Sequence, residues 1–150
     1  MKLSSRSDYA AKAMLELSLT PDRPINLAYL AQVENISISY LEQIFALLRK
    51  DGLVKSVRGP GGGYILGRPL NEITIGDIVK SIDMSRPSKK AAQSEALANS
   101  GETYLPASRK MWEQLSHFVY DYLNNITLAD MHDAQKDNQE QKNERTHQAA

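Results

Sequence analysis

The glycine run in the middle of the chain constrains its fold more than any other feature. Gly59-Pro60-Gly61-Gly62-Gly63 cannot continue a helix or a regular strand, because glycine packs no side chain and proline lacks an N–H donor. Residues 53–57 have the pattern of a half-buried strand, and residues 64–66 resume a strand after the run. Two short strands around a glycine-rich turn predict a β-hairpin.

Three helical patterns precede this hairpin. The first is expected to start at Ser7 as its N-cap and to stop before Pro21, and the second to start at Asn26. The third is expected to start at Ser37 and to end at Gly52 in a left-handed C-cap. Its predicted buried stripe consists of Leu41, Ile44, Phe45 and Leu48.

Further elements are expected after the hairpin. Thr74 should cap a fourth helix that ends near Asp83. Residues 84–105 are polar and rich in alanine without a helical period, and we interpret them as a flexible linker. A long helix and a short last helix fill residues 106–132, and the charged tail 133–150 is expected to be disordered. The apolar side of the long helix consists of Met111, Trp112, Leu115, Phe118, Val119, Tyr122 and Leu123.

These elements predict a mainly α protein with a small β-hairpin. Two short helices, a tight break, a third helix and a hairpin follow the order of a winged helix-turn-helix, which we assign to residues 1–83. Charge supports contact with phosphates even though the 18 Lys and Arg balance the 18 Asp and Glu. Salt screens charges beyond roughly 10 Å, so a local basic patch can act on a neutral protein. Residues 49–68 form such a patch, with Arg49, Lys50, Lys55, Arg58 and Arg68 against Asp51 alone.

The third helix of such a fold enters the major groove of DNA, because only that groove admits a helix and displays a readable base pattern. Its candidate DNA-binding residues are Ser37, Ser39, Tyr40, Glu42, Gln43, Arg49 and Lys50. Gln43 can form two hydrogen bonds with adenine, and Glu42 can accept one from cytosine. Ser39 and Tyr40 suit phosphates or base edges. The plainer alternative is a capped helix with a solvated face.

The hairpin is the second candidate contact. Arg58 precedes the glycine run, where bare backbone lets its guanidinium approach a narrow minor groove. We therefore add Arg58, Gly61, Gly62, Gly63 and Tyr64 to the candidate DNA-binding residues. A nucleotide-binding phosphate loop does not fit, because no Gly-Lys-Ser/Thr follows and the loop leads into a strand rather than a helix.

Several stretches carry a resemblance to a known family. SISYLEQIF at 37–45, LRKDGLV at 48–54 and VRGPGGGY at 57–64 resemble the signature of IscR-like regulators, the iron–sulfur regulators of the Rrf-type winged-helix family. LNNITL at 123–128 also resembles that family. The resemblance implies a homodimer, paired through the apolar side of the long helix, that binds a two-fold site in double-stranded DNA. It also implies that Ser39, Glu42 and Gln43 meet bases, Tyr40 the DNA backbone, and Arg58 with the Gly61–Gly63 loop the minor groove.

The chain departs from this family in its sensor. It contains no cysteine, whereas members that hold a cluster carry three cysteines with five residues between neighbours. By the resemblance these places fall at Ala92, Ala98 and Tyr104, and the fourth ligand, a histidine, falls near Ala107. A cluster would have no thiolate ligands, so we expect no cofactor and a regulator that lost or replaced its sensor.

Other functions have less support in the sequence. His117, His132 and His147 are isolated, so we expect no metal site, and no arrangement of Ser, His and Asp suggests an enzyme. No apolar run is long enough for a membrane span and no signal peptide is evident, which predicts a cytoplasmic protein. The alternative to a DNA regulator is an interaction module whose partner supplies the signal, and a regulatory protein or small-molecule effector would fit either function.

Overall fold

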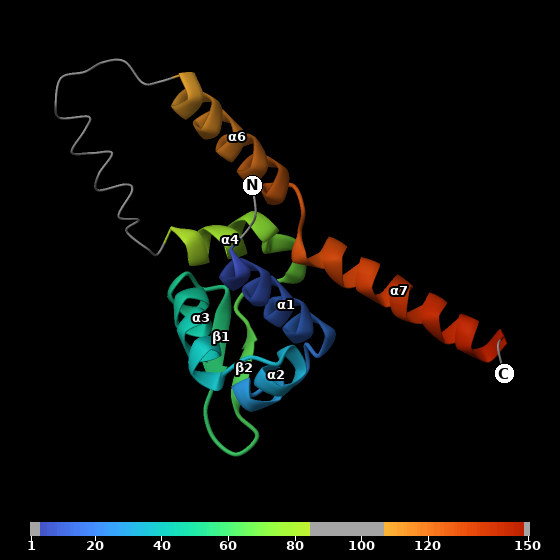
Figure 1. The fold of residues 1–150 in the computed structure, drawn as a ribbon. Helices are drawn as coiled ribbons and strands as arrows, with labels where there is room; N and C mark the ends of the chain where they lie inside the picture. Colours follow the sequence, from blue (N-terminus) through green and yellow to red (C-terminus); the bar gives the residue numbers. More distant parts are fainter. Residues whose placement is uncertain (1–3, 85–106, 149–150) are drawn as a thin grey trace.

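The computed structural model describes residues 4–84 and 107–148, with side chains described as far as residue 142 (Figure 1). The fold is mainly helical with one two-stranded sheet, as the sequence predicts. Residues 85–106 lie outside the described part of the chain. They include most of the expected linker and the three places Ala92, Ala98 and Tyr104.

Three helices open the fold. α1 spans Ser5–Leu19, α2 spans Leu27–Glu34 and α3 spans Ile38–Lys50. The predicted caps of α2 and α3 are confirmed, because the side chain of each cap residue accepts a hydrogen bond from the backbone N–H three residues later. Between these helices Asn35 adopts the left-handed conformation, with φ of 52°, and this produces the tight break.

The prediction that Ser7 caps α1 is wrong. The cap is Ser4, whose Oγ accepts a hydrogen bond from the Ser7 backbone N–H at 3.2 Å. Ser7 lies inside the helix and is buried, and its hydroxyl donates to Asp83 Oδ1 at 3.0 Å. The reason is tertiary, since starting α1 at Ser5 brings Ser7 against α4, where a carboxylate accepts its hydrogen bond.

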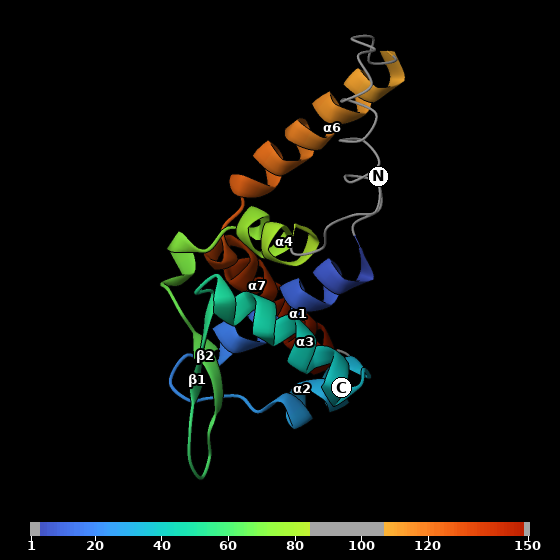
Figure 2. The same ribbon diagram turned by 90° about the vertical axis from the view of Figure 1, so that its left-hand side faces the viewer.

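β1 (Val54–Val57) and β2 (Gly63–Leu66) form the predicted antiparallel hairpin. The loop between them contains a turn in which the Gly62 N–H donates to Gly59 O at 2.9 Å. Pro60 precedes Gly61, whose φ is +72°, and this is the residue pattern of a type II turn. Figure 2 shows the tip of the hairpin reaching beyond the layer of helices.

A short 3-10 turn, η1 (Leu70–Glu72), leads into α4 (Ile75–Asp83). Thr74 caps α4 as predicted, and Asp77 completes a reciprocal capping box. The Asp77 N–H donates to Thr74 Oγ1 at 3.0 Å, and the Thr74 N–H donates to Asp77 Oδ2 at 3.2 Å.

Two long helices complete the chain and diverge from a junction beside α4 (Figure 1). α6 spans Ala107–Asn124 and α7 spans Leu128–Gln148. The expectation of a short last helix followed by a disordered tail from residue 133 is wrong, because α7 continues through that region. Its residues include many Gln, Lys and Glu, which favour helix but leave no apolar period in the sequence.

The core lies between α1, α3, α4 and the hairpin. The predicted buried stripe of α3 is confirmed, because its four apolar residues are all fully buried. Burial of each side chain of this size stabilises the fold by about 1.5–3 kcal/mol. The largest fully buried side chains are Phe45, Met14, Leu30, Leu41, Ile44, Leu48, Leu53, Ile73, Ile78, Ile82, Leu128 and Val54.

The junction between α6 and α7 is attached to the body by backbone hydrogen bonds. The Ile75 N–H donates to Ile126 O at 2.8 Å, and the Leu128 N–H donates to Ile73 O at 2.7 Å. Leu128 is fully buried in the core. The two C-terminal helices therefore start from a fixed point on the body.

None of the helices in residues 4–84 and 107–148 is long and apolar enough to cross a bilayer.

Candidate nucleic-acid interface

The face of α3 opposite its buried stripe is exposed and polar. Ser37, Ser39, Glu42, Gln43, Arg49 and Lys50 are exposed, and Tyr40 is half-buried. Their separation from the apolar residues follows from the helical period, which places positions three and four apart on one face. Within the described residues, the side chains of Ser39, Glu42, Arg49 and Lys50 have no hydrogen-bond or ion-pair partner. This face is free to bind an external ligand.

The half-buried Tyr40 is held by α1. Its ring packs edge-on against Tyr9, with ring centroids 6.0 Å apart and an interplanar angle of 89°. The guanidinium carbon of Arg6 lies 5.7 Å from the centroid of the Tyr40 ring. A cation over an aromatic ring is attractive, so these two contacts fix the ring at the edge of the polar face.

Arg6 also contacts Gln43. Its Nη2 donates to Gln43 Oε1 at 2.9 Å, and this hydrogen bond links the first turn of α1 to the polar face of α3. No motif in the sequence marks Arg6 as functional. The two residues are 37 positions apart, and no local pattern in a single sequence reports a contact between two helices at that separation.

The loop of the hairpin presents Arg58 at an exposed position, with no polar partner among the described residues. Gly59 and Gly61 have φ of +104° and +72°, and a Cβ at either would meet open space. These two glycines are therefore required by backbone conformation. Together they leave two positions of the loop near Arg58 without a side chain.

The remaining glycines of the run have a different physical reason. A Cβ at Gly62 would collide with the Val57 carbonyl, and one at Gly63 would collide with the Ile25 carbonyl. Both positions allow close approach of backbone to backbone within the protein. Gly62 and Gly63 thus shape the loop and attach it to the segment before α2.

Tyr64 also attaches the hairpin to the segment before α2. Its backbone pairs with Ile25 through hydrogen bonds of 2.8 and 3.0 Å, and its ring packs on Phe45 with centroids 4.7 Å apart. The ring of this candidate DNA-binding residue therefore supports the hairpin from inside.

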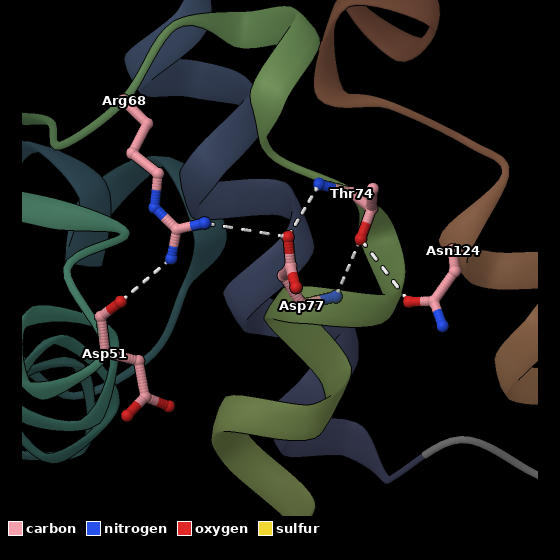
Figure 3. A network of polar contacts seen from close by, with 5 residues as sticks. All are labelled: Asp51, Arg68, Thr74, Asp77 and Asn124. Atoms are coloured by element: carbon pink, nitrogen blue, oxygen red, sulfur yellow. Dashed lines mark hydrogen bonds and ion pairs between the residues drawn. The ribbon is translucent and has the colours of Figure 1, made fainter.

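Arg68, which the sequence places in the basic patch, is engaged within the protein. Figure 3 shows its Nη2 donating to the Asp51 carbonyl oxygen at 2.9 Å and its Nη1 lying 3.9 Å from Asp77 Oδ2. The contacts join the end of α3, the end of the hairpin and the start of α4. The same view shows Thr74 donating to Asn124 Oδ1 at 3.5 Å, which brings the end of α6 to this point.

The predicted apolar side of α6 divides into two parts. Leu123 is buried and Val119 packs against the core, so these residues attach α6 to the body. Met111, Trp112, Phe118 and Tyr122 are 53%, 54%, 71% and 62% exposed. Leu115 lies between them and is half-buried. Met111, Leu115, Phe118 and Tyr122 have the alternating spacing of four and three residues that marks a coiled-coil seam.

Potential metal ligands do not cluster in the described part of the chain. Residues 4–84 and 107–142 hold no group of three or more His, Asp or Glu side chains that could bind a metal ion. His132 lies beside Asp133, with Nδ1 3.2 Å from Oδ1. The chain has no cysteine, so the thiolates that an iron–sulfur cluster requires do not exist in it.

An exposed polar third helix, next to a glycine-rich hairpin that carries an exposed arginine, is the arrangement of one class of protein: the winged helix-turn-helix DNA-binding proteins. The chain belongs to the Rrf2 family, whose model, described as an iron-dependent transcriptional regulator, matches residues 3–134. It is accordingly a DNA-binding transcriptional regulator and not an enzyme.

Individual relatives agree with this family. The chain is 43% identical over 132 residues to the HTH-type transcriptional regulator IscR of Erwinia tasmaniensis. The matched region covers 87% of this chain and 78% of that protein. Its fold is similar to T. potens IscR, with a TM-score of 0.70, 35% identity and coverage of 87% and 85% of the two chains. It is also similar to CymR, the global cysteine regulator of B. subtilis, with a TM-score of 0.69, 34% identity and coverage of 89% and 98%.

Proposed function

We propose that this chain is a homodimeric regulator that recognises a two-fold symmetric operator and does so without an iron–sulfur cluster. The observation that carries the proposal is the exposed polar face of α3 beside the unpartnered Arg58 of the hairpin. These polar groups bond to water in the free protein, so they are available to exchange that water for the hydrogen-bonding groups of DNA.

The polar face of α3 is proposed to lie in the major groove. Ser39, Glu42 and Gln43 would face base edges, while Tyr40 at the edge of the face would contact the DNA backbone. Arg49 and Lys50, at the far end of α3, would neutralise phosphates. Ser37 caps the helix with its side chain, so its proposed role is to hold the first turn in place.

The hairpin is proposed to reach the adjacent minor groove. Arg58 would enter the groove, because a narrow minor groove has an enhanced negative potential. Gly61, with open space where a Cβ would be, would let the loop backbone approach the sugar–phosphate edges. Gly62, Gly63 and Tyr64 would support the loop through their contacts with Val57, Ile25 and Phe45.

Dimerisation is proposed to use the exposed seam of α6. Large apolar side chains exposed in a row favour burial against a second surface. A second copy of the same seam provides one of matching length and spacing, and a dimer of this kind places two recognition helices on a two-fold DNA site. The absence of cysteine supports regulation by something other than a cluster.

The test selects binding sites from random-sequence DNA with the full-length protein. A palindromic consensus with half-sites about one helical turn apart is expected. Arg58→Ala should weaken binding and lower the salt slope by about 1, whereas Lys110→Ala, which removes a charge from exposed α6, should change little. Failure to enrich any sequence would contradict the proposal.

The same surfaces allow a second function. The exposed seam of α6 could hold a different protein, in which case this chain would be an interaction module whose partner supplies the signal. Sedimentation of the purified protein separates the two. A monomer at micromolar concentration that forms a stoichiometric complex with one other protein favours the second function, and a homodimer favours the first.

A further inference from the structure

We propose that Arg6 is a positioning residue that fixes the side-chain amide of Gln43, so that Gln43 presents its NH₂ group to DNA. The position would then select a base edge that accepts hydrogen bonds. The inference deepens the proposed function and rests on it, because it concerns how the polar face of α3 discriminates between bases.

The first step is the chemistry of the contact. Arg6 Nη2 donates to Gln43 Oε1 at 2.9 Å. A guanidinium has donors and no acceptor, whereas a glutamine amide carries an acceptor at one end and two donors at the other. A rotated amide would turn its NH₂ group toward the NH₂ group of Arg6 and would lose the hydrogen bond. Arg6 therefore favours one of the two amide orientations.

The second step is the rigidity of Arg6. Its guanidinium carbon lies 5.7 Å from the centroid of the Tyr40 ring, which restrains the head group. The start of α1 is anchored to the end of α4, because Ser4 Oγ and Ser7 Oγ both donate to Asp83 Oδ1, at 2.9 and 3.0 Å. Arg6 is thus restrained at its backbone by the anchored start of α1 and at its guanidinium by the Tyr40 ring. It can therefore orient the neighbouring Gln43 amide.

The third step is the consequence for base reading. With Oε1 turned toward Arg6, the Gln43 amide offers N–H donors to the major groove. Guanine N7 and O6, adenine N7 and thymine O4 accept hydrogen bonds there, whereas cytosine N4 donates. A fixed donor thus disfavours cytosine. It also weakens the two-bond pairing with adenine, because that pairing uses the same oxygen to accept from adenine N6.

The experiment measures base preference at one position of the operator. Sites are first selected from random DNA with the wild-type protein, and relative affinities are then measured for the four bases at the position that Gln43→Ala makes degenerate. Arg6→Lys, which keeps a donor-only head group, should retain the preference. Arg6→Met should reduce the preference for an acceptor over cytosine by about 3- to 10-fold.

A reversed variant sharpens the test. Arg6→Glu replaces the donor with an acceptor, which should attract the Gln43 NH₂ group and turn Oε1 outward. The preference should then shift toward bases that donate, cytosine and adenine. Arg23→Met is the matched control, because it removes an arginine beyond the other end of α1 and should leave the preference unchanged.

Two results would overturn the inference. If Arg6→Met weakens all four bases equally and lowers the salt slope by about 1, Arg6 is a phosphate contact and does not position Gln43. If Arg6→Met leaves the base preference at this position unchanged, Arg6 does not orient the Gln43 amide. Failure of the wild-type protein to select any sequence would instead contradict the proposed function itself. Far-ultraviolet circular dichroism and thermal melting confirm that each variant folds.

Discussion

At the scale of single residues, one buried glycine shows how close packing can exclude any side chain. Gly76, in the first turn of α4, is buried against the side chain and backbone of Asn124 at the end of α6. No other residue allows these helices to approach so closely. Gly76 therefore sets the distance between α4 and α6.

Gly76→Ala is expected to destabilise the protein by about 1–3 kcal/mol, because the added methyl group would collide with the Asn124 amide. The sign is diagnostic, since glycine to alanine inside a helix normally stabilises by about 1 kcal/mol. Urea unfolding measures the change. Asn124→Ala in the same background should recover most of the loss, and wild-type stability of Gly76→Ala alone would contradict the packing argument.

Gly61 offers a second test at this scale. Its φ is +72° and a Cβ there would meet nothing, so substitution acts through backbone conformation alone. Gly61→Ala should distort the turn at a cost of about 1–2 kcal/mol and weaken DNA binding. Gly61→Asn should retain most of the affinity, because asparagine tolerates the left-handed conformation. Fluorescence anisotropy with the selected operator compares them, and equal affinities would argue against a conformational role.

At the scale of elements, polar caps decide where the helices begin. Thr127 and Asp130 form such a cap for α7: the Thr127 N–H donates to Asp130 Oδ2 at 2.8 Å, and the Asp130 N–H donates to Thr127 Oγ1 at 3.2 Å. The hydrogen bond from the Thr127 backbone, and next that from its hydroxyl, lowers the pKa of Asp130. The charged carboxylate therefore stabilises the start of the helix.

This cap predicts a pH dependence. A carboxylate whose pKa is lowered by folding contributes stability above its unfolded pKa, and the contribution is lost as pH falls through the folded pKa. The melting temperature of Asp130→Asn should be below that of wild type at pH 7, and the gap should narrow as the pH falls below the ordinary carboxylate range. Asp133→Asn, an exposed neighbour on the same helix, should show a smaller gap at pH 7. A gap independent of pH would exclude the charged cap.

Where α1 and α2 meet, folding shifts the pKa of a carboxyl group in the opposite direction. Partial burial, and next the nearby charge of Glu34, raises the pKa of Glu16. A carboxyl group whose pKa is raised by folding contributes stability below its unfolded pKa, which is lost as pH rises through the folded pKa. Glu16→Gln should therefore raise the melting temperature slightly at pH 7 and not at pH 4. Thermal melts at the two pH values measure the difference, and a loss of stability at pH 7 would contradict the assignment.

At the scale of the whole molecule, α6 extends away from the body (Figure 1). It carries a row of exposed apolar side chains. Phe118, 71% exposed, is near the middle of the seam that we propose to pair two copies. Among the large hydrophobic side chains of the described residues it has the highest exposed fraction, and a dimer would bury it.

Phe118→Asp is expected to convert the protein to a monomer, because a carboxylate in a desolvated seam has no partner. Affinity for the two-fold operator should fall more than tenfold, since each half-site would bind alone. His117→Asp places the same charge on another side of α6 and should leave the dimer intact. Analytical ultracentrifugation gives the mass of each variant, and a Phe118→Asp dimer would rule out this seam.

The sequence by itself determined the order and type of most elements. Periodicity marked the buried stripe of α3, and cap residues located the starts of α2, α3 and α4. The glycine run predicted the hairpin, because the backbone conformations that Gly59 and Gly61 adopt are restricted locally. These features depend on residues close together in the chain. The local sequence pattern therefore contains the residues that cause the structure. The last helix was expected, but its extent beyond residue 132 was not, because the polar residues there leave no such pattern.

Only the tertiary structure decided which side chains meet. It engaged Arg68 with Asp51 and packed the ring of Tyr64 on Phe45. It also divided the apolar side of α6 between the core and the surface, and it joined Arg6 to Gln43. Each of these outcomes depends on how two elements distant in sequence pack against each other. A residue type states what bonds a side chain can form, whereas packing decides which partner is within reach.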